Sequence, residues 1–159
     1  MILTTHAIVG AAIASLIPDH PVSAFSVGVA SHFAIDAIPH WDYPLRSMFR
    51  RAAGTSLVVD TGLLTDFGFI ALDGIAGLAL AIWLFATPAT IATIMLGALG
   101  GMAPDPLQFV HRLYPHEPLR SLQRFHLWIH TKTRLGWKLG VTTQSAFALI
   151  VTFLAKALA

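Results

Sequence analysis

A histidine and an aspartate stand one helical turn apart in the otherwise apolar segment 31–42, at His32 and Asp36. Side chains four residues apart in a helix lie on the same face, so these two groups can meet. An imidazole and a carboxylate in apolar surroundings are costly unless each has a strong partner, and a divalent cation would satisfy both at once. The pair therefore predicts a metal site.

Other ionisable residues lie where helices would bring them close to this pair. His6 stands in the first turn of one expected helix, Asp73 in the first half of another and Asp105 just past the end of a third. At 1.5 Å of rise per residue, His32 and Asp73 lie about 10 Å from the same end of the bundle. The expected metal ligands are His6, His32, Asp36, Asp73, Asp105 and, following the second helix, Asp42.

Three further histidines are candidates for proton transfer in catalysis. His40 follows Pro39 after the second expected helix, whereas His126 and His130 repeat the one-turn spacing on a segment with an amphipathic pattern. A solvated polar face also explains the second pair, and a helix–helix hydrogen bond also explains Asp73. These alternatives stay open at the level of sequence.

The chain contains no cysteine, so any metal must be held by nitrogen and oxygen. Histidine and carboxylate ligands suit zinc first, with manganese or iron as alternatives, and several aspartates would permit two ions. Such an ion converts water into hydroxide, and a nearby histidine can assist the leaving oxygen. The predicted cofactor is one or two divalent ions, and the predicted chemistry is hydrolysis.

The composition indicates an integral membrane protein. Of the 159 residues, 55% are hydrophobic and 11% are charged, and the mean hydropathy is +0.69. Soluble domains carry about 25% charged residues. The sequence predicts one all-α membrane bundle over 1–159, with about five transmembrane helices and an interfacial amphipathic helix. The helices are expected at about 4–16, 21–38, 63–86, 88–103 and 139–158, and the interfacial segment at about 118–138.

Basic residues follow the second and fourth expected spans, whereas Lys156 is alone at the other end. By the positive-inside rule, the loops rich in arginine and lysine and the N-terminus are cytoplasmic. We expect an integral protein of a prokaryotic cytoplasmic membrane, with membrane lipids as partners. The formal charge of +2 is too small for a nucleic-acid binder.

Small residues recur at four-residue spacing beside the candidate ligands. Examples are Gly10 after His6, and the pair Gly97 and Gly101 before Asp105. Small residues at this spacing let membrane helices pack closely. The faces that carry the ligands are therefore expected to point into the bundle.

The chain resembles the small membrane-bound, metal-dependent hydrolase family, which is distantly similar to zinc-dependent phospholipases C of helical fold. The resemblance rests on three motifs: Thr5-His6, the segment 28–36 with Pro39-His40-Trp41-Asp42 after it, and Ala103-Pro104-Asp105. It implies hydrolysis of a phosphoester or similar bond, with metal ligation by His6, His32, Asp36 and Asp105. The His-Arg-Gly-x-Thr-His-Ser segment of longer members is absent, and 125–131 is a loose counterpart.

The sequence thus predicts a hydrolase of a lipid or lipid-linked phosphoester at the cytoplasmic membrane face. Two other classes stay open. A cation or metal transporter would also bury carboxylates and histidines, but through the full depth of the membrane. A non-enzymatic scaffold would tolerate the loss of His32 and Asp36. The limited interior of five short helices is compatible with a homo-oligomer.

Overall fold

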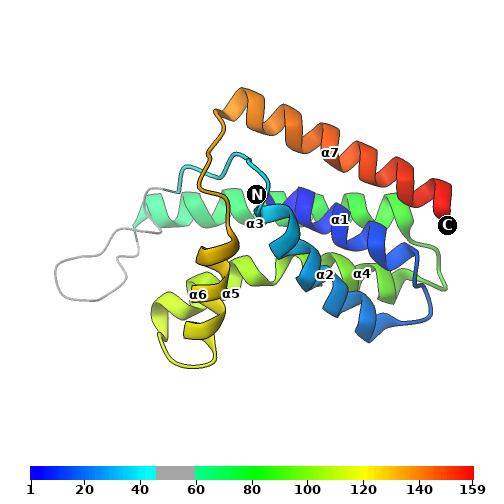
Figure 1. Ribbon diagram of the computed structural model, residues 1–159, viewed down its shortest axis with the longest axis horizontal. Helices are drawn as coiled ribbons and strands as arrows, with labels where there is room; N and C mark the ends of the chain where they lie inside the picture. The colour runs from blue at the N-terminus through cyan, green and yellow to red at the C-terminus, as the bar shows by residue number, and fades with distance from the viewer. Residues whose placement is uncertain (46–59) are drawn as a thin grey trace.

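The computed structural model describes residues 1–45 and 60–159, and over these residues the chain is all-α (Figure 1). The basic residues that follow the second expected span, Arg46, Arg50 and Arg51, lie outside the described residues. The helices are α1 (Leu3–Ser15), α2 (Pro21–Asp36), α3 (Thr61–Phe85), α4 (Ile91–Met102), α5 (Pro104–Leu113), α6 (Leu119–Ile129) and α7 (Trp137–Leu158).

The five main helices alternate in direction. In Figure 1, α1, α3 and α7 run from left to right, and α2 and α4 run back. The α5–α6 pair extends from the bundle on the side where α3 begins, away from the end of α7. The turn between α1 and α2 and the turn between α3 and α4 therefore lie at the opposite end from α5 and α6.

Within the described residues, two helices are long and apolar enough to cross a membrane, α3 and α7, and not the five expected. The apolar helices α1 and α4 have 13 and 12 residues. At 1.5 Å per residue they span about 20 Å and about 18 Å, against about 30 Å of bilayer hydrocarbon. Hydropathy located the apolar runs, but the helix expected at 88–103 is shorter: α4 begins at Ile91, because Thr87–Thr90 form a turn.

Helices α1, α2 and α4 pack backbone against backbone. A Cβ atom added at Gly10 or at Gly28 would overlap the carbonyl oxygen of Gly97, and one added at Gly101 would overlap that of His6. Only glycine allows this approach. The structure confirms that the small-residue series point inward, so the helices that carry the candidate ligands are held in close contact.

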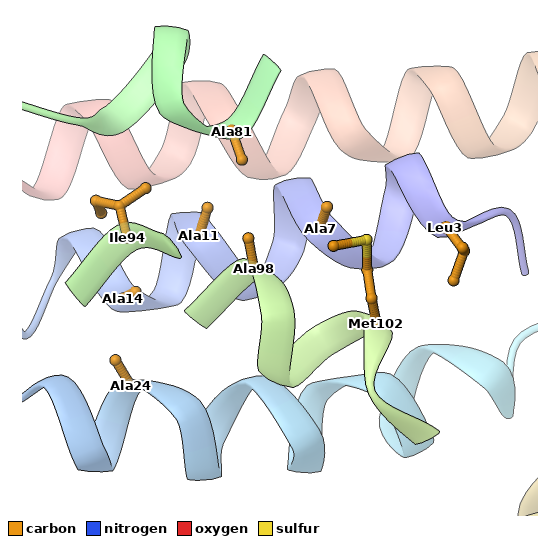
Figure 2. Packing of buried hydrophobic residues seen from close by; sticks show 9 residues of the cluster. All are labelled: Leu3, Ala7, Ala11, Ala14, Ala24, Ala81, Ile94, Ala98 and Met102. Carbon is orange, nitrogen blue, oxygen red and sulfur yellow. The ribbon is translucent and has the colours of Figure 1, made fainter. Parts of the chain in front are cut away.

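A hydrophobic core lies between α1, α2, α3 and α4 (Figure 2). Figure 2 shows its side chains, which are mostly small and project from α1, α2, α3 and α4. Alanines are abundant because the helices are too close for larger residues. The cluster consists of Leu3, Ala7, Ala11, Ala14, Ala24, Ala81, Ile94, Ala98 and Met102.

Two elements near the candidate ligands differ from the sequence expectation. The helix expected to end before Pro104-Asp105-Pro106 does end there, at Met102, but the same three residues also begin a helix that was not expected, α5. Proline is tolerated there because the first-turn amides have no partner within the helix. The segment expected to be helical over 118–138 is helical only over Leu119–Ile129, and residues 130–136 run beside the chain after α2.

Candidate metal centre

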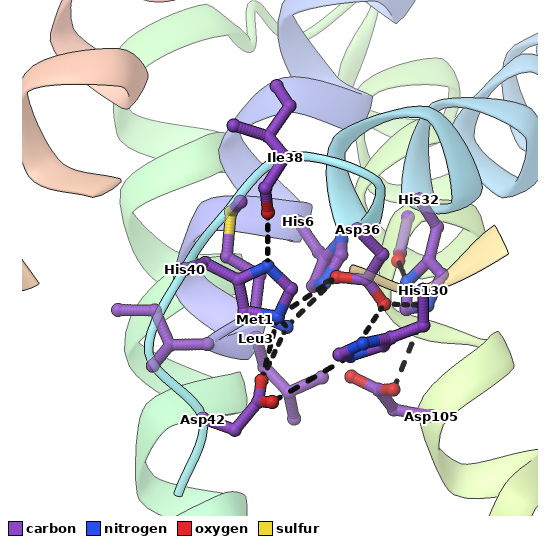
Figure 3. A network of polar contacts seen from close by, with 12 residues as sticks. Met1, Leu3, His6, His32, Asp36, Ile38, His40, Asp42, Asp105 and His130 are labelled. Carbon is purple, nitrogen blue, oxygen red and sulfur yellow. Dashed lines mark hydrogen bonds and ion pairs between the residues drawn. The ribbon is translucent and has the colours of Figure 1, made fainter. Parts of the chain in front are cut away.

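Asp36 lies at the centre of a buried cluster of histidines and carboxylates (Figure 3). Its Oδ2 atom is 3.2 Å from His32 Nε2 and 3.1 Å from His126 Nε2. Its Oδ1 atom is 3.2 Å from His6 Nε2. Asp36 is 1% exposed, and all three rings are buried. Side chains from α1, α2 and α6 therefore converge on one carboxylate.

The ligand atoms fall into two groups that could each hold a metal ion, and within each group they lie within 4.8 Å of one another. We call the first the His32 group; it consists of His32, Asp36, Asp105 and His126. We call the second the His40 group; it consists of Asp36, His40 and His130. Asp36 belongs to both groups.

Several buried nitrogen atoms of the cluster have no hydrogen-bond partner. They are both ring nitrogens of His6, Nε2 of His32 and Nδ1 of His126. The His6 ring stacks on the His32 ring with centroids 3.9 Å apart. A buried polar atom without a partner costs about 1–3 kcal/mol. Two of these atoms, Nε2 of His6 and Nε2 of His32, face Asp36 oxygens at 3.2 Å without hydrogen-bond geometry, which fits a centre whose cation would bind both nitrogens.

The hydrogen bonds at the far side of the rings fix which nitrogen faces the cluster. Nδ1 of His32 donates to the carbonyl oxygen of Gly101 at 2.8 Å, and Nδ1 of His40 donates to that of Ile38 at 2.7 Å. Nδ1 of His130 donates to Thr131 at 3.0 Å. A carbonyl can only accept, so the proton is on Nδ1 and the Nε2 lone pair points into the cluster. Metal-binding histidines are oriented in this way.

Backbone hydrogen bonds hold the two non-helical segments of the site together. The amide of Thr131 donates to the carbonyl of Asp36 at 2.8 Å, and that of Leu135 donates to His40 at 3.0 Å. From α7, Gln144 donates its Nε2 to the Trp41 carbonyl at 3.0 Å. The residues after α6 are thereby tied to those after α2, which places His130 beside His40.

The Met1 amino group lies between two carboxylates of the site. It donates to Asp36 Oδ1 at 2.9 Å and to Asp42 Oδ1 at 3.0 Å. Burial lowers the pKa of this amine, but the carboxylates outweigh burial and raise it. Burial likewise raises the pKa of Asp42, yet the adjacent His40 ring and the amine bring it below its usual range. The site is therefore built to stabilise positive charge.

Asp73 lies outside both groups. Its carboxylate accepts hydrogen bonds from the Thr4 amide at 3.0 Å, from the Thr4 hydroxyl at 2.6 Å and from the Tyr43 hydroxyl. Burial and the Asp73 hydrogen bond raise the pKa of Tyr43. Asp73 therefore joins α3 to the first turn of α1 and to the chain after α2, whereas the other predicted ligands lie in or against the two groups.

A cavity of about 890 Å³ opens beside the site. From the site it is lined by Asp42, Asp105, His126 and His130. Three cationic residues, Arg112, Lys132 and Arg134, also line it. Its remaining wall is largely apolar and comes from α3, α5 and α6, from the start of the chain and from residues 43–45. A cavity of this size is typical of a small-molecule binding site.

Gln108 is a site residue that the sequence analysis missed. Its Nε2 donates to Asp105 Oδ1 at 3.0 Å and lies 3.5 Å from His126 Nε2, and Gln123 donates to its Oε1 at 3.3 Å. Gln108 thus orients two members of the His32 group. Its spacing of three residues from Asp105 is a helical signal, but it has meaning only once α5 is known to be a helix.

No protein-family model, no curated protein and no solved structure matches this chain. The resemblance seen in the motifs is therefore not supported by any of the three comparisons, and no family is assigned to this chain. Over residues 1–45 and 60–159, the protein is all-helical and has two histidine and aspartate groups that could hold a metal ion.

Proposed function

We propose that this protein is a membrane-associated, metal-dependent hydrolase of a lipid or lipid-linked phosphoester. The observation that carries the proposal is the convergence of the Nε2 atoms of His6, His32 and His126 on buried Asp36, the first two without a hydrogen bond. A structural role for these histidines would require hydrogen-bond partners for the nitrogens. A divalent cation supplies partners for nitrogen and carboxylate together.

Two ligand sets follow from the two groups. The first ion would be held by the His32 group, and the His6 ring stacks on the His32 ring of that group. The second would be held by the His40 group, with Asp42 as a further carboxylate, since Asp42 Oδ1 is 2.9 Å from His40 Nε2. Zinc is the first choice for nitrogen and oxygen ligands in a buried site, with manganese and iron as alternatives.

A bound divalent ion would supply a hydroxide at neutral pH and withdraw charge from phosphoryl oxygens. Among the residues, His130 is the best placed for proton transfer. It lines the cavity and its side chain is 22% exposed, and its Nε2 lies 3.7 Å from Asp42 Oδ2. His40 and His126 are buried inside the two groups, which suits them to ligation instead. With only the His32 group occupied, His130 could give a proton to the leaving oxygen; with a second ion in the His40 group, its Nε2 would be a ligand instead.

The cavity and the outer helices support an amphiphilic substrate. Cationic side chains beside the metal ligands favour a phosphate group, and the apolar wall favours a hydrocarbon chain. Only 11% of the apolar window of α3 and 17% of that of α7 is buried in the protein, which suits helices that face lipid. The described basic residues lie mainly at the site end, which supports a cytoplasmic location for this end under the positive-inside rule.

Metal analysis by plasma mass spectrometry tests the proposal. We would compare wild type with the double variant His32→Ala, Asp36→Ala, each purified without chelator and resupplied with zinc, manganese or iron. The matched control is Asp19→Ala, His20→Ala, which removes an exposed aspartate and histidine from the turn after α1. Wild type and control should hold stoichiometric metal, and the site variant should hold none.

Two results would contradict the proposal. If wild-type protein resupplied with metal holds none, the proposed metal centre is wrong. Stoichiometric metal without release of phosphate or phosphorylated headgroup from any of a panel of phospholipids and polyprenyl phosphates would leave a metal protein without the proposed activity. In that second case, metal flux into proteoliposomes would test transport, although the described core beyond the site is hydrophobic.

A further inference from the structure

The residues that line the cavity are of two chemical kinds. Charged groups come from the site carboxylates and histidines and from Arg112, Lys132 and Arg134. Apolar side chains include Phe67 and Ile70 from α3 and Phe109 from α5. A ligand that matches this lining carries both an anionic group and an apolar group.

An aromatic pair within the apolar lining joins α3 to α5. The rings of Phe67 and Phe109 meet edge to face, with centroids 4.9 Å apart. Both residues line the cavity, and Phe67 is 37% exposed. The pair thus borders the cavity on one side and the outer surface of α3 on the other.

The apolar lining continues onto the outer face of α3. Leu64, Phe69 and Leu72 on that helix are each 64% to 68% exposed, although all are large and hydrophobic. In water, such a face would carry a large free-energy cost. Against bilayer hydrocarbon it carries none, so α3 offers an apolar surface that runs from the lipid to the edge of the cavity.

We infer that Phe67 and Phe109 form the subsite for the hydrocarbon chain of the substrate, which enters from the bilayer beside α3 while its phosphate lies among the cations and site ligands. This inference rests on the proposed function and names the substrate class: a phosphate ester of a long hydrocarbon chain, taken from the membrane and not from solution. It makes Phe67 and Phe109 determinants of chain-length specificity.

The absence of native cysteine allows a direct test. We would prepare Phe67→Cys and Phe109→Cys in full-length, metal-loaded protein in phosphatidylcholine nanodiscs, and measure alkylation by a membrane-permeant maleimide. Dodecyl phosphate at about ten times its Kd should slow alkylation about tenfold at each position. Inorganic phosphate should not change the rate. The matched control is Phe69→Cys, on the same helix and exposed, which should react equally fast with and without dodecyl phosphate.

Equal alkylation of Phe67→Cys and Phe109→Cys with and without dodecyl phosphate would overturn the inference, as would equal protection of Phe69→Cys. If a cysteine variant fails to fold, the test uses the wild-type protein. The affinities of dodecyl phosphate and butyl phosphate are then measured by their competition with a spin-labelled alkyl phosphate. After correction for partition into the bilayer, dodecyl phosphate should bind more tightly than butyl phosphate, and equal affinities would overturn the subsite.

These outcomes are separable from those of the proposed function. If dodecyl phosphate protects the two thiols but the protein holds no metal, the subsite for the hydrocarbon chain is supported and the proposed hydrolase activity is rejected. Stoichiometric metal without protection would keep the centre and remove the subsite. Each inference can therefore fail while the other stands.

Discussion

The His32 group and the His40 group share one carboxylate but are built from different parts of the fold. All four members of the His32 group lie on helices, and only Asp105 is not fully buried. In the His40 group, His40 and His130 both lie on non-helical segments, and His130 borders the cavity. Ligands on rigid elements keep their geometry better than ligands on loops. We therefore expect the His32 group to hold its ion more tightly.

Asp36→Asn is the change expected to have the largest effect, because it removes the shared charge while keeping the side-chain volume. Both groups should lose their metal, as measured by plasma mass spectrometry, with helicity by circular dichroism unchanged. Asp73→Asn is the matched control, since Asp73 binds Thr4 and Tyr43 outside both groups. Loss of metal in Asp73→Asn and retention in Asp36→Asn would reverse the assignment.

His32→Ala and His130→Ala should separate the two groups. We expect His32→Ala to lose the tightly held ion, whereas His130→Ala should keep that ion and lose the one that exchanges faster. Equilibrium dialysis against a graded series of zinc buffers would count the ions retained by each variant. Identical metal titrations of the two variants would show that the His32 group and the His40 group do not differ in metal affinity, contrary to the expectation from their helical and non-helical positions.

Gly101→Ala should have a smaller effect that acts on the His32 group alone. The added methyl group would overlap the His6 carbonyl oxygen, and the Gly101 carbonyl also accepts the His32 Nδ1–H. Overpacking of this kind costs about 1–3 kcal/mol. Thermal unfolding should show the loss of stability, and zinc titration a weaker first ion.

The control for this substitution is Gly68→Ala on α3, where an added Cβ would meet nothing within 4 Å. In a helix this change should stabilise the protein by about 1 kcal/mol. Equal destabilisation by both substitutions would mean that the close approach of α1 and α4 does not support the site.

The local part of the site could be predicted from the sequence. The spacing of His32 and Asp36 fixes their common face in any helix, and the structure places their atoms 3.2 Å apart. Periodicity also indicated the inward faces of the small-residue series. These features depend only on the geometry of one helix.

The remainder depends on rotations and on folding between distant segments. The rise per residue predicts a depth along a helix but not which neighbour a side chain meets, and the partners of Asp73 are Thr4 and Tyr43. His126 meets Asp36 across 90 residues, because α5 begins at prolines that resembled a helix end and α6 then returns to the bundle. A single sequence carries no signal for such a return.

The shared carboxylate has a consequence for how the centre would be loaded. An ion in one group would neutralise part of the Asp36 charge and thereby change the affinity of the other group. Thermodynamic linkage makes this influence reciprocal, so each ion must alter the binding of the other by the same factor. With Asp36 common to both, we expect negative cooperativity, and the binding isotherm should show two separated steps at increasing free metal concentration.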